Sequence, residues 1–328
     1  MKTETFRGRN WIDSELDYSI EEYNTLIDIA LNLKSRYALG ETHSHLLKDK
    51  TIYLIFFNQS LRTRNSFEAG ITQLGGHAHI LDPLKIYTPA MPGEDIPYST
   101  ERVADVARTL ERYGHAIAIR MYGGPTGWVY GRANEIIKEF AKWVKVPIIN
   151  MECDKYHPCQ TLADLITIKE KVGGFKKRKF VMSWAYSGSC KKPVSVPQSA
   201  ILGATKMGMD VVQVQPKGFE LDPAVIDQCK KFAQQNGSSF EISYDMEEAF
   251  KDADVVYPKS WGSLECFADR QGKKVDMDKM KNLFEQNKDW ICTEEKMKLA
   301  KQNCIYMHCL PCDRGQEVTD AVIDGPQS

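Results

Sequence analysis

The sequence lacks the features that mark membrane and secreted proteins. In its 328 residues, no apolar run approaches the roughly 20 residues that a membrane-spanning helix needs. Residues 1–7 do not contain the apolar core of a signal peptide. The nine cysteines are an odd number spread through a long chain, which argues against a disulfide framework. We therefore expect a cytoplasmic protein with reduced thiols.

The sequence also lacks an excess of charge of either sign. Its 43 Lys and Arg residues against 44 Asp and Glu residues leave a formal net charge of −1. Such a balance gives no electrostatic reason to expect nucleic acid or an anionic membrane as a partner. With 27% charged and 42% hydrophobic residues, the composition is that of a globular protein, and the length suffices for two domains with sizeable cores.

One stretch combines a buried strand, the start of a helix and phosphate-binding side chains. Residues 51–57 form a short β-branched and aromatic run, which predicts a buried strand. Residues 66–74 have apolar side chains at helical spacing, and Asn58 or Ser60 is placed to cap that helix. Ser, Thr and Arg side chains at a helix N-terminus suit an anion, because a guanidinium matches phosphate oxygens two at a time. The alternative is a capped helix with solvated arginines.

Strands and helices alternate along the rest of the chain. Because such alternation builds parallel sheets covered by helices, we expect an α/β fold of two Rossmann-like domains, residues 1–152 and 153–328. The expected strands are 77–81, 116–120, 146–151, 179–184, 210–214, 240–243 and 254–257. The expected helices are 20–31, with a capping box at Ser19 and Glu22, then 99–110, 135–144, 158–171, 199–207, 223–236 and 246–251. Residues 82–99 are expected to form a loop.

Polar side chains stand at the ends of two of these elements. Arg120 closes the strand 116–120, and open α/β sheets bind ligands at the carboxyl ends of their strands. Pro158 opens a helix, which places His157 and Gln160 beside its unpaired N–H groups. The second half has no Gly-x-Gly-x-x-Gly after its first strand, so a dinucleotide is disfavoured.

Two short patterns admit a metal or redox interpretation. His77 and His79 fall on one side of an alternating strand, an arrangement that is more often free of metal. Cys309 and Cys312 have the Cys-x-x-Cys spacing of redox pairs and zinc sites. This pair has neither a second ligand pair at suitable spacing nor a thioredoxin-like context. We expect no metal at either pattern.

Three motifs together resemble the aspartate/ornithine carbamoyltransferase family. Residues 60–64, Ser-Leu-Arg-Thr-Arg, are similar to its carbamoyl-phosphate signature Ser-x-Arg-Thr-Arg. Residues 157–164 resemble its second donor motif, His-Pro-x-Gln-x-Leu-Ala-Asp, and residues 308–311 resemble its His-Cys-Leu-Pro. The resemblance covers nearly the whole chain. It implies an enzyme that needs no cofactor and a homotrimer in which the loop 82–100 reaches the neighbouring site.

The resemblance also implies a role for individual residues. Carbamoyl phosphate would be bound by Ser60, Leu61, Arg62, Thr63, Arg120, His157, Gln160 and Leu310. The acceptor would be bound by Glu152, Lys259, Ser260, Trp261, Cys309, Leu310 and Arg314. The transfer itself would depend on Arg62, Arg120, His157 and Cys309. The amine attacks the carbamoyl carbon directly, so Cys309 need not be a nucleophile.

The segment 259–261, Lys-Ser-Trp, bears on the acceptor. A lysine suits an acceptor carboxylate and repels the α-ammonium of ornithine. This segment and the insert 187–198 are similar to the N-acetylornithine and N-succinylornithine enzymes and to an allied bacterial group. That branch implies a deep knot, with the loop 185–198 threaded by the chain that follows Asp254.

Other positions keep alternatives open. The N-acetylornithine enzymes have a basic residue where this chain has Asp313 and a lysine where it has Glu317. Ornithine and N-acetylornithine therefore remain alternative acceptors. A catalytically inactive, carbamoyl-phosphate-binding regulatory protein is the alternative of another class. The resemblance further implies one more strand and a long helix after Ser328, with another arginine near the phosphate.

Overall fold

The computed structural model describes residues 3–328 and confirms the two-part α/β organisation. One compact unit comprises the chain up to Gly127 together with Gly131–Cys159, and the other comprises Trp128–Tyr130 together with Gln160–Ser328. Residues 1 and 2, which the expected first domain includes, lie outside the described residues. Between residues 3 and 328, no helix has both the length and the apolar character to cross a membrane.

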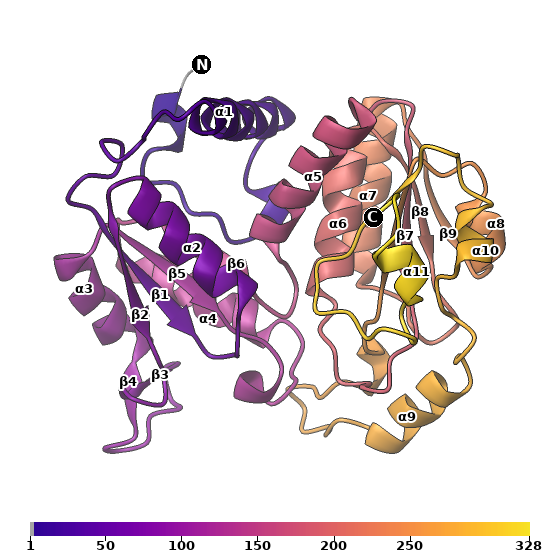
Figure 1. The fold of residues 1–328 in the computed structure, drawn as a ribbon. Coiled ribbons are helices and arrows are strands. Elements are labelled where there is room, and N and C mark those ends of the chain that lie inside the picture. Colours follow the sequence, from indigo (N-terminus) through magenta and orange to yellow (C-terminus); the bar gives the residue numbers. More distant parts are fainter. Residues whose placement is uncertain (1–2) are drawn as a thin grey trace. The chain divides into compact units, whose positions relative to one another are not determined.

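The first unit is built on a four-stranded parallel sheet with the order β2-β1-β5-β6 (Figure 1). Its strands are β1 (Thr51–Phe56), β2 (His77–Leu81), β5 (Ala116–Arg120) and β6 (Ile148–Glu152). Its helices are α1 (Ile20–Ala38), α2 (Arg62–Gln73), α3 (Val103–Tyr113) and α4 (Arg132–Trp143), with short 3₁₀ turns at Thr3–Phe6, Ser14–Leu16 and Gly124–Thr126. Phe67 and Ile71 of α2 pack against Ile52 and Leu54 of β1. The apolar residues that predicted β1 therefore also form the surface on which α2 packs.

The start of α2 differs from the expectation. The helix begins at Arg62 after Leu61, whose side chain does not cap it, and the Ser60 hydroxyl accepts a hydrogen bond from the Arg64 N–H, with 3.4 Å between Oγ and N. The Asn58 side chain does not cap it. Instead, its amide accepts from the Tyr122 N–H at 2.9 Å and donates to the Tyr122 carbonyl at 3.0 Å. In α1, by contrast, the capping box of Ser19 and Glu22 is present as predicted.

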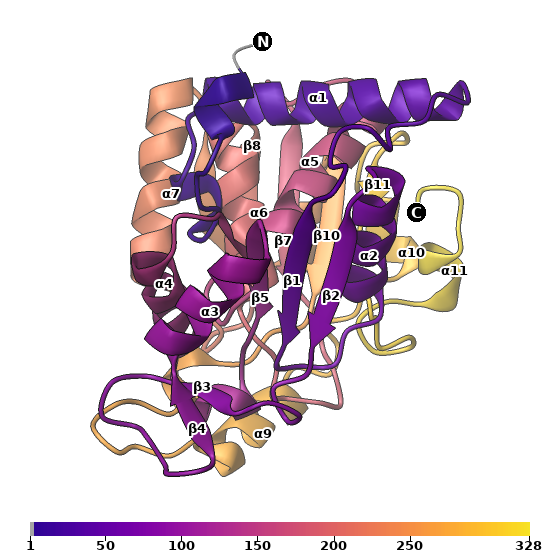
Figure 2. The same cartoon turned by 90° about the vertical axis from the view of Figure 1, so that its left-hand side faces the viewer.

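The segment 82–99 is not wholly a loop. Thr88–Ala90 forms β3, which pairs in parallel with β4 (Thr100–Arg102), and Figure 2 shows the two strands side by side. Because residues 100–102 are extended, α3 starts at Val103 instead of following Ser99. A serine at position 99 favours a helix N-cap, but the pairing of β3 with β4 keeps the residues after Ser99 extended.

The second unit has a five-stranded parallel sheet with the order β11-β10-β7-β8-β9. Its strands are β7 (Lys179–Trp184), β8 (Asp210–Val214), β9 (Phe240–Ser243), β10 (Val255–Lys259) and β11 (Ile305–Tyr306). Its helices are α5 (Pro158–Val172), which begins two residues before the unit does, α6 (Ser195–Lys206), α7 (Pro223–Asn236), α8 (Met246–Phe250), α9 (Met277–Glu285), α10 (Glu294–Met297) and α11 (Asp320–Ile323), with a 3₁₀ turn at Leu264–Cys266. In Figure 1, α6 and α7 cover one side of this sheet, and α8 and α10 lie on the other.

The expected domain boundary after residue 152 differs from the observed division. Residues 153–159 stay with the first unit because the Asp154 carboxylate caps α4, accepting from the N–H groups of Ala133 and Asn134 at 3.1 and 3.3 Å. Conversely, Trp128–Tyr130 belong to the second unit. The Tyr130 hydroxyl donates to the Asp222 carboxylate at 2.8 Å, which holds this short segment there.

The insert expected at residues 187–198 is shorter than the resemblance implied, because Ser195 already begins α6. Backbone hydrogen bonds tie the remaining loop, residues 185–194, to segments far along the chain. Ala185 N–H donates to the Lys259 carbonyl at 3.1 Å, and Gly262 N–H donates to the Lys192 carbonyl at 3.0 Å. The later chain therefore runs directly against this loop. The knot itself stays a prediction.

Candidate active site

The residues of the first motif meet Arg120 in the first unit. In the sheet register, Phe56 lies opposite Arg120, so β1 and β5 end together. The Arg120 guanidinium donates to the Thr63 hydroxyl at 3.0 Å and lies 2.9 Å from the Glu152 carboxylate, which ends β6. The Arg120 side chain is only 13% exposed. We call Thr63, Arg120, Tyr122, Glu152 and His157 the Arg120 cluster.

Tyr122 belongs to this cluster, although the sequence analysis did not single it out. Its hydroxyl accepts a hydrogen bond from the Arg120 guanidinium at 3.1 Å, and its ring centroid lies 5.3 Å from the guanidinium carbon. The Asn58 side-chain amide, which donates to the Tyr122 carbonyl and accepts from the Tyr122 N–H, fixes the Tyr122 backbone in turn. Because three groups hold one guanidinium, Arg120 is oriented before any ligand arrives. In the sequence, the position of Tyr122 two residues after Arg120 is the only signal that the tyrosine orients this arginine.

His157 completes the Arg120 cluster. Its Nε2 atom lies 3.7 Å from the Glu152 carboxylate, and the side chain is buried. Burial lowers the pKa of His157 to about 4, and the charge of Arg120 adds to this effect while Glu152 opposes it. The imidazole is therefore neutral at physiological pH. A neutral imidazole can donate a hydrogen bond to a carbonyl oxygen without adding a full charge.

Arg62 and Arg64 stand on the first turn of α2 and are exposed. Neither guanidinium forms a hydrogen bond or an ion pair with another residue among those described. Their charges add to the positive end of the helix dipole. Ser60 and Arg64 also line a cavity of about 740 Å³, together with Phe57, Arg132 and Glu94. Leu61 is 71% exposed, and its side chain is not packed in the core. We expect Leu61 to contact a ligand through its backbone. This end of α2 is a ready anion site.

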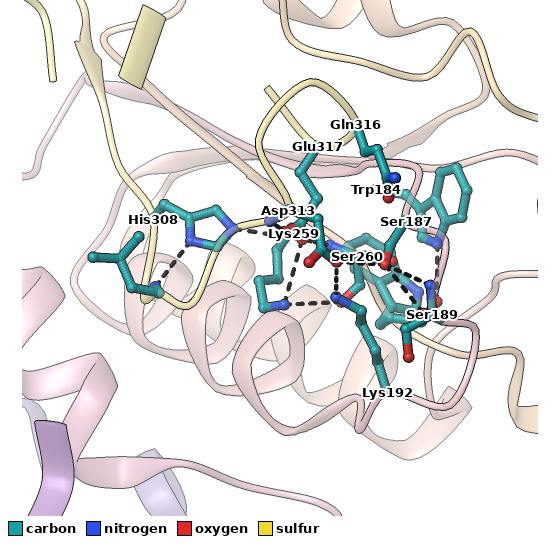
Figure 3. Close-up of polar contacts among 12 residues, drawn as sticks. Trp184, Ser187, Ser189, Lys192, Lys259, Ser260, His308, Asp313, Gln316 and Glu317 are labelled. Carbon is teal, nitrogen blue, oxygen red and sulfur yellow. Dashed lines mark hydrogen bonds and ion pairs between the residues drawn. The ribbon is translucent and has the colours of Figure 1, made fainter. Parts of the chain in front are cut away.

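A second group of motif residues surrounds Glu317 in the second unit (Figure 3). Glu317 has no exposed surface. Its carboxylate accepts from the Ser260 N–H at 2.6 Å and from the Asp313 N–H at 2.8 Å. The Lys259 ammonium lies 3.4 Å away and His308 Nε2 lies 3.5 Å away. We call Lys192, Lys259, Ser260, His308, Asp313 and Glu317 the Glu317 cluster.

The charges in the Glu317 cluster compensate one another. Although burial alone raises the pKa of the Glu317 carboxyl, Lys259, His308 and Lys192 hold it well below its usual range. Lys192 comes from the loop 185–194, and its ammonium lies 2.6 Å from the Asp313 carboxylate. The sequence analysis missed both Lys192 and the contacts of Glu317. Position 317 was noted only because the N-acetylornithine enzymes have a lysine where this chain has Glu317.

His308, Cys312 and Glu317 bring three possible metal ligands within 4.8 Å of one another. The hydrogen bonding of His308 argues against a metal. Its Nδ1 accepts from the Leu310 N–H at 2.9 Å, so the proton of the neutral ring sits on Nε2, the atom that faces Glu317. A metal-bound histidine needs the opposite arrangement, in which the second ring nitrogen donates. The Lys259 ammonium beside Glu317 would also repel a cation.

Other predicted site residues have different environments. Trp261 is fully buried, and its indole N–H donates to the Phe219 carbonyl at 2.9 Å, so its side chain has no surface for an acceptor. Arg314 is exposed and lies 2.7 Å from Asp320 and 2.6 Å from Asp324. Two carboxylates already compensate its charge. The structure therefore brings Lys259, but not Arg314, into the Glu317 cluster.

The remaining predicted residues lie on α5 and on the loop after β11. The Gln160 amide donates to the Asp164 carboxylate at 2.9 Å. Cys309 and Leu310 follow His308, and the peptide bond between Leu310 and Pro311 is cis. Leu310 is 43% exposed.

Comparison with known proteins identifies the family of both halves of the chain. Residues 10–170 match the family model described as the carbamoyl-P binding domain of aspartate/ornithine carbamoyltransferase. Residues 183–328 match the model described as the Asp/Orn binding domain of the same family. The N-acetylornithine carbamoyltransferase of Xylella fastidiosa (strain 9a5c) is 38% identical over 318 residues, which are 94% of this chain and 90% of that protein. The ornithine carbamoyltransferase of Pyrococcus horikoshii is 38% identical over 325 residues, which are 99% of this chain and 90% of that protein.

Solved structures agree. An acetylornithine transcarbamylase complexed with acetylcitrulline superposes with a TM-score of 0.87 at 35% identity, covering 97% of this chain and 92% of that one. A variant N-acetyl-L-ornithine transcarbamylase complexed with carbamyl phosphate and N-succinyl-L-norvaline gives 0.87 at 34% identity, covering 97% and 93%. The chain therefore belongs to the aspartate/ornithine carbamoyltransferase family and resembles its acetylornithine branch.

Proposed function

We propose that this protein transfers the carbamoyl group of carbamoyl phosphate to the amine of a carboxylate-bearing acceptor and releases phosphate. The observation that carries the proposal is the Arg120 cluster beside the N-terminus of α2. There, the Arg120 guanidinium is held in place by Thr63, Tyr122 and Glu152, while those of Arg62 and Arg64 form no hydrogen bond or ion pair with the described residues. An oriented guanidinium at a strand end, with two further guanidiniums on the adjacent helix start, suits a phosphorylated donor.

Each group has a defined part in donor binding. Ser60, Arg62, Thr63 and the Leu61 backbone hold the phosphate at the start of α2, where the helix N–H groups and dipole favour an anion. Arg120 bonds the phosphate edge and the carbamoyl oxygen. Charge-assisted hydrogen bonds of this kind contribute roughly 1.5–3 kcal/mol each.

Transfer needs stabilisation of the oxyanion that forms when the neutral amine attacks the carbamoyl carbon. Thr63, Arg120 and the neutral His157 are the donors for that oxygen. Removal of one such donor typically costs about 2.7–4 kcal/mol of transition-state stabilisation. Gln160 and the Leu310 carbonyl accept the N–H groups of the carbamoyl NH₂. Cys309 lies beside the attacking amine and forms no covalent bond. No metal or organic cofactor takes part.

The Glu317 cluster supports an acceptor with a carboxylate. Lys259 and Lys192 also face carboxylates of the cluster, but their side chains are only 13% and 16% exposed, so an acceptor carboxylate there would be poorly screened by water. Arg314 is 47% exposed and lies between two aspartates, so we place the acceptor carboxylate at the two lysines. A free α-ammonium next to Lys259 would be repelled. We therefore place N-acetylornithine, the acceptor that the names of relatives indicate, before ornithine. Glu152 and the backbone of Ser260 and Trp261 complete the proposed acceptor contacts.

We also propose a homotrimer in the cytoplasm. The segment 82–100 exposes large apolar side chains, with Leu84 92% and Tyr98 95% exposed and Ile96 58% exposed. Apolar side chains gathered on one segment favour a protein neighbour that covers them. Size-exclusion chromatography with light scattering tests this point, and a monomer at micromolar concentration would contradict it.

The enzyme is tested by measuring phosphate release from carbamoyl phosphate with a panel of amines that includes N-acetylornithine and ornithine. We expect release with a carboxylate-bearing amine, and we expect Arg62→Ala to abolish it while the circular dichroism spectrum is unchanged. Lys230→Ala, an exposed lysine on α7 outside the motifs and outside the segment 82–100, is the matched control. Binding of carbamoyl phosphate without release for any amine would instead support the inactive regulatory protein.

A further inference from the structure

Asp164 is a buried acid to which the proposed mechanism gives no role. It lies on α5 one helical turn after Gln160, is 7% exposed, and accepts a hydrogen bond from the Gln160 amide nitrogen at 2.9 Å. An ionised carboxylate only accepts hydrogen bonds, and a protonated carboxyl group still accepts at its carbonyl oxygen, whereas a carboxamide has one donating and one accepting end. The contact therefore decides which end of the Gln160 amide turns towards Asp164 and which end turns away.

Asp164 has a second neighbour, Tyr257, which lies on β10 and is fully buried. Burial raises the pKa of the Tyr257 hydroxyl, and the Asp164 carboxyl and the Cys309 thiol both raise it further. This hydroxyl forms no hydrogen bond with the described residues. Tyr257 therefore lies near residues of both the second and the third motif. Burial raises the pKa of Asp164 to about 7, against the opposing effects of Gln160 and Tyr257. Burying a carboxyl group costs free energy of desolvation. Its presence here therefore points to a function that an apolar residue would not serve.

We infer that Asp164 is a positioning residue that fixes the Gln160 carboxamide with its oxygen towards the donor, and that this orientation makes the protein prefer a carbamoyl to an acetyl group. The inference rests on the proposed contact between Gln160 and the carbamoyl NH₂. With the amide nitrogen bound to Asp164, the Gln160 oxygen accepts an N–H from a carbamoyl group. The methyl of acetyl phosphate, which has nearly the same shape, offers no N–H.

Such selection has a familiar physical basis. A site that hydrogen-bonds a substrate NH₂ rejects the isosteric analogue because its own polar group is then left unpaired. If the Gln160 amide were free to turn, its NH₂ end would face the donor about as often, and the preference would shrink. A purely structural role of Asp164 would instead change the unfolding midpoint and leave the relative affinity for the two donors unaltered.

The experiment compares dissociation constants for carbamoyl phosphate and acetyl phosphate, measured by titration calorimetry on the full chain. The wild-type protein is expected to prefer carbamoyl phosphate by roughly tenfold or more. Asp164→Leu should remove most of this preference and Gln160→Leu should remove it as well. Asp164→Asn should keep most of it, because the asparagine oxygen still accepts from Gln160. Asp227→Leu, an exposed aspartate on α7, is the control and should behave as wild type.

Two results would overturn the inference. The first is equal affinity of the wild-type protein for the two donors, which needs no variant to fold. The second is an unchanged preference in folded Asp164→Leu, or in the smaller Asp164→Ala, while Gln160→Leu loses it. If Gln160→Leu keeps the preference, the contact on which the inference rests is wrong, yet tight binding of carbamoyl phosphate would still uphold the proposed function. Loss of that binding in the wild-type protein would contradict the proposed function itself.

Discussion

The backbone N–H of Ser260 donates a hydrogen bond to the Glu317 carboxylate across 2.6 Å. This contact joins the segment after β10 to the loop that follows the His-Cys-Leu-Pro motif. Glu317 also accepts from the Asp313 N–H and lies beside the Lys259 ammonium, with no exposed surface of its own. One buried carboxylate therefore sets the shape of the loop that carries Cys309 and Leu310.

We predict that Glu317→Ala destabilises the protein strongly. The substitution leaves two buried N–H groups unpaired and removes the counter-charge of Lys259, and loss of one partner of a buried ion pair typically costs about 3–5 kcal/mol. The free energy of unfolding, from urea titration followed by tryptophan fluorescence, measures the effect. Glu248→Ala is the matched control, because the Glu248 side chain is 64% exposed and its ion pair with Lys251 lies on the surface. A loss in Glu317→Ala no larger than the control's would show that the carboxylate is not what holds the loop.

The His157 environment predicts a pH dependence of stability. The folded-state pKa is lowered to about 4, below the ordinary value of 6.5, so the unfolded chain takes up the proton first as the pH falls. Stability is therefore lost between pH 6.5 and 4, by up to about 1.4 kcal/mol per pH unit for this one group. His157→Gln, which cannot be protonated, removes this part of the slope.

The measurement is the difference in unfolding free energy between wild type and His157→Gln at pH 7.5 and at pH 4.5. The wild type should lose more stability between the two values than the variant does. His115→Gln is the control, since that side chain is exposed. Equal losses in wild type and His157→Gln would mean that the folded His157 is protonated as readily as the unfolded one.

The sequence predicted the elements that depend on local patterns. The β-branched run at residues 51–56 became β1, and the capping box at Ser19 became the start of α1. The elements it misplaced depend on contacts between distant residues. Asn58 or Ser60 was expected to cap the helix, but the Asn58 amide hydrogen-bonds both backbone groups of Tyr122, 64 positions away. No local pattern distinguishes these two uses of an asparagine.

The site shows the same division. Arg120 and His157 could be predicted because they end a strand and begin a helix, where ligands bind in this fold class. Lys192 could not, because its contact with Asp313 spans 121 positions and involves a loop without periodicity. The acceptor role of Arg314 stays a prediction, but its ion pairs with Asp320 and Asp324 could not be foreseen from any local pattern.

Tyr122→Phe is predicted to weaken catalysis while the fold stays intact. The variant loses the hydrogen bond to the Arg120 guanidinium at 3.1 Å but keeps the ring beside it. Since such a bond contributes about 0.5–1.5 kcal/mol, we expect kcat/KM for carbamoyl phosphate to fall roughly threefold to tenfold. Steady-state phosphate release measures this. Tyr244→Phe, on the exposed surface of the second unit, serves as the control. A Tyr122→Phe enzyme with wild-type kcat/KM would show that Thr63 and Glu152 alone orient Arg120.

The last prediction separates the two candidate partners of the acceptor carboxylate. Lys192→Met should raise the acceptor KM by roughly tenfold or more, because a charge-assisted hydrogen bond contributes about 1.5–3 kcal/mol and the Lys192 side chain is only 16% exposed. Arg314→Met should leave the acceptor KM within about twofold, since an exposed ion pair contributes little and two aspartates already hold this guanidinium. Both variants keep long apolar side chains, and the KM for carbamoyl phosphate is the internal control. The reverse pattern, with Arg314→Met impaired and Lys192→Met unaffected, would place the acceptor at the surface turn and remove the Glu317 cluster from acceptor binding.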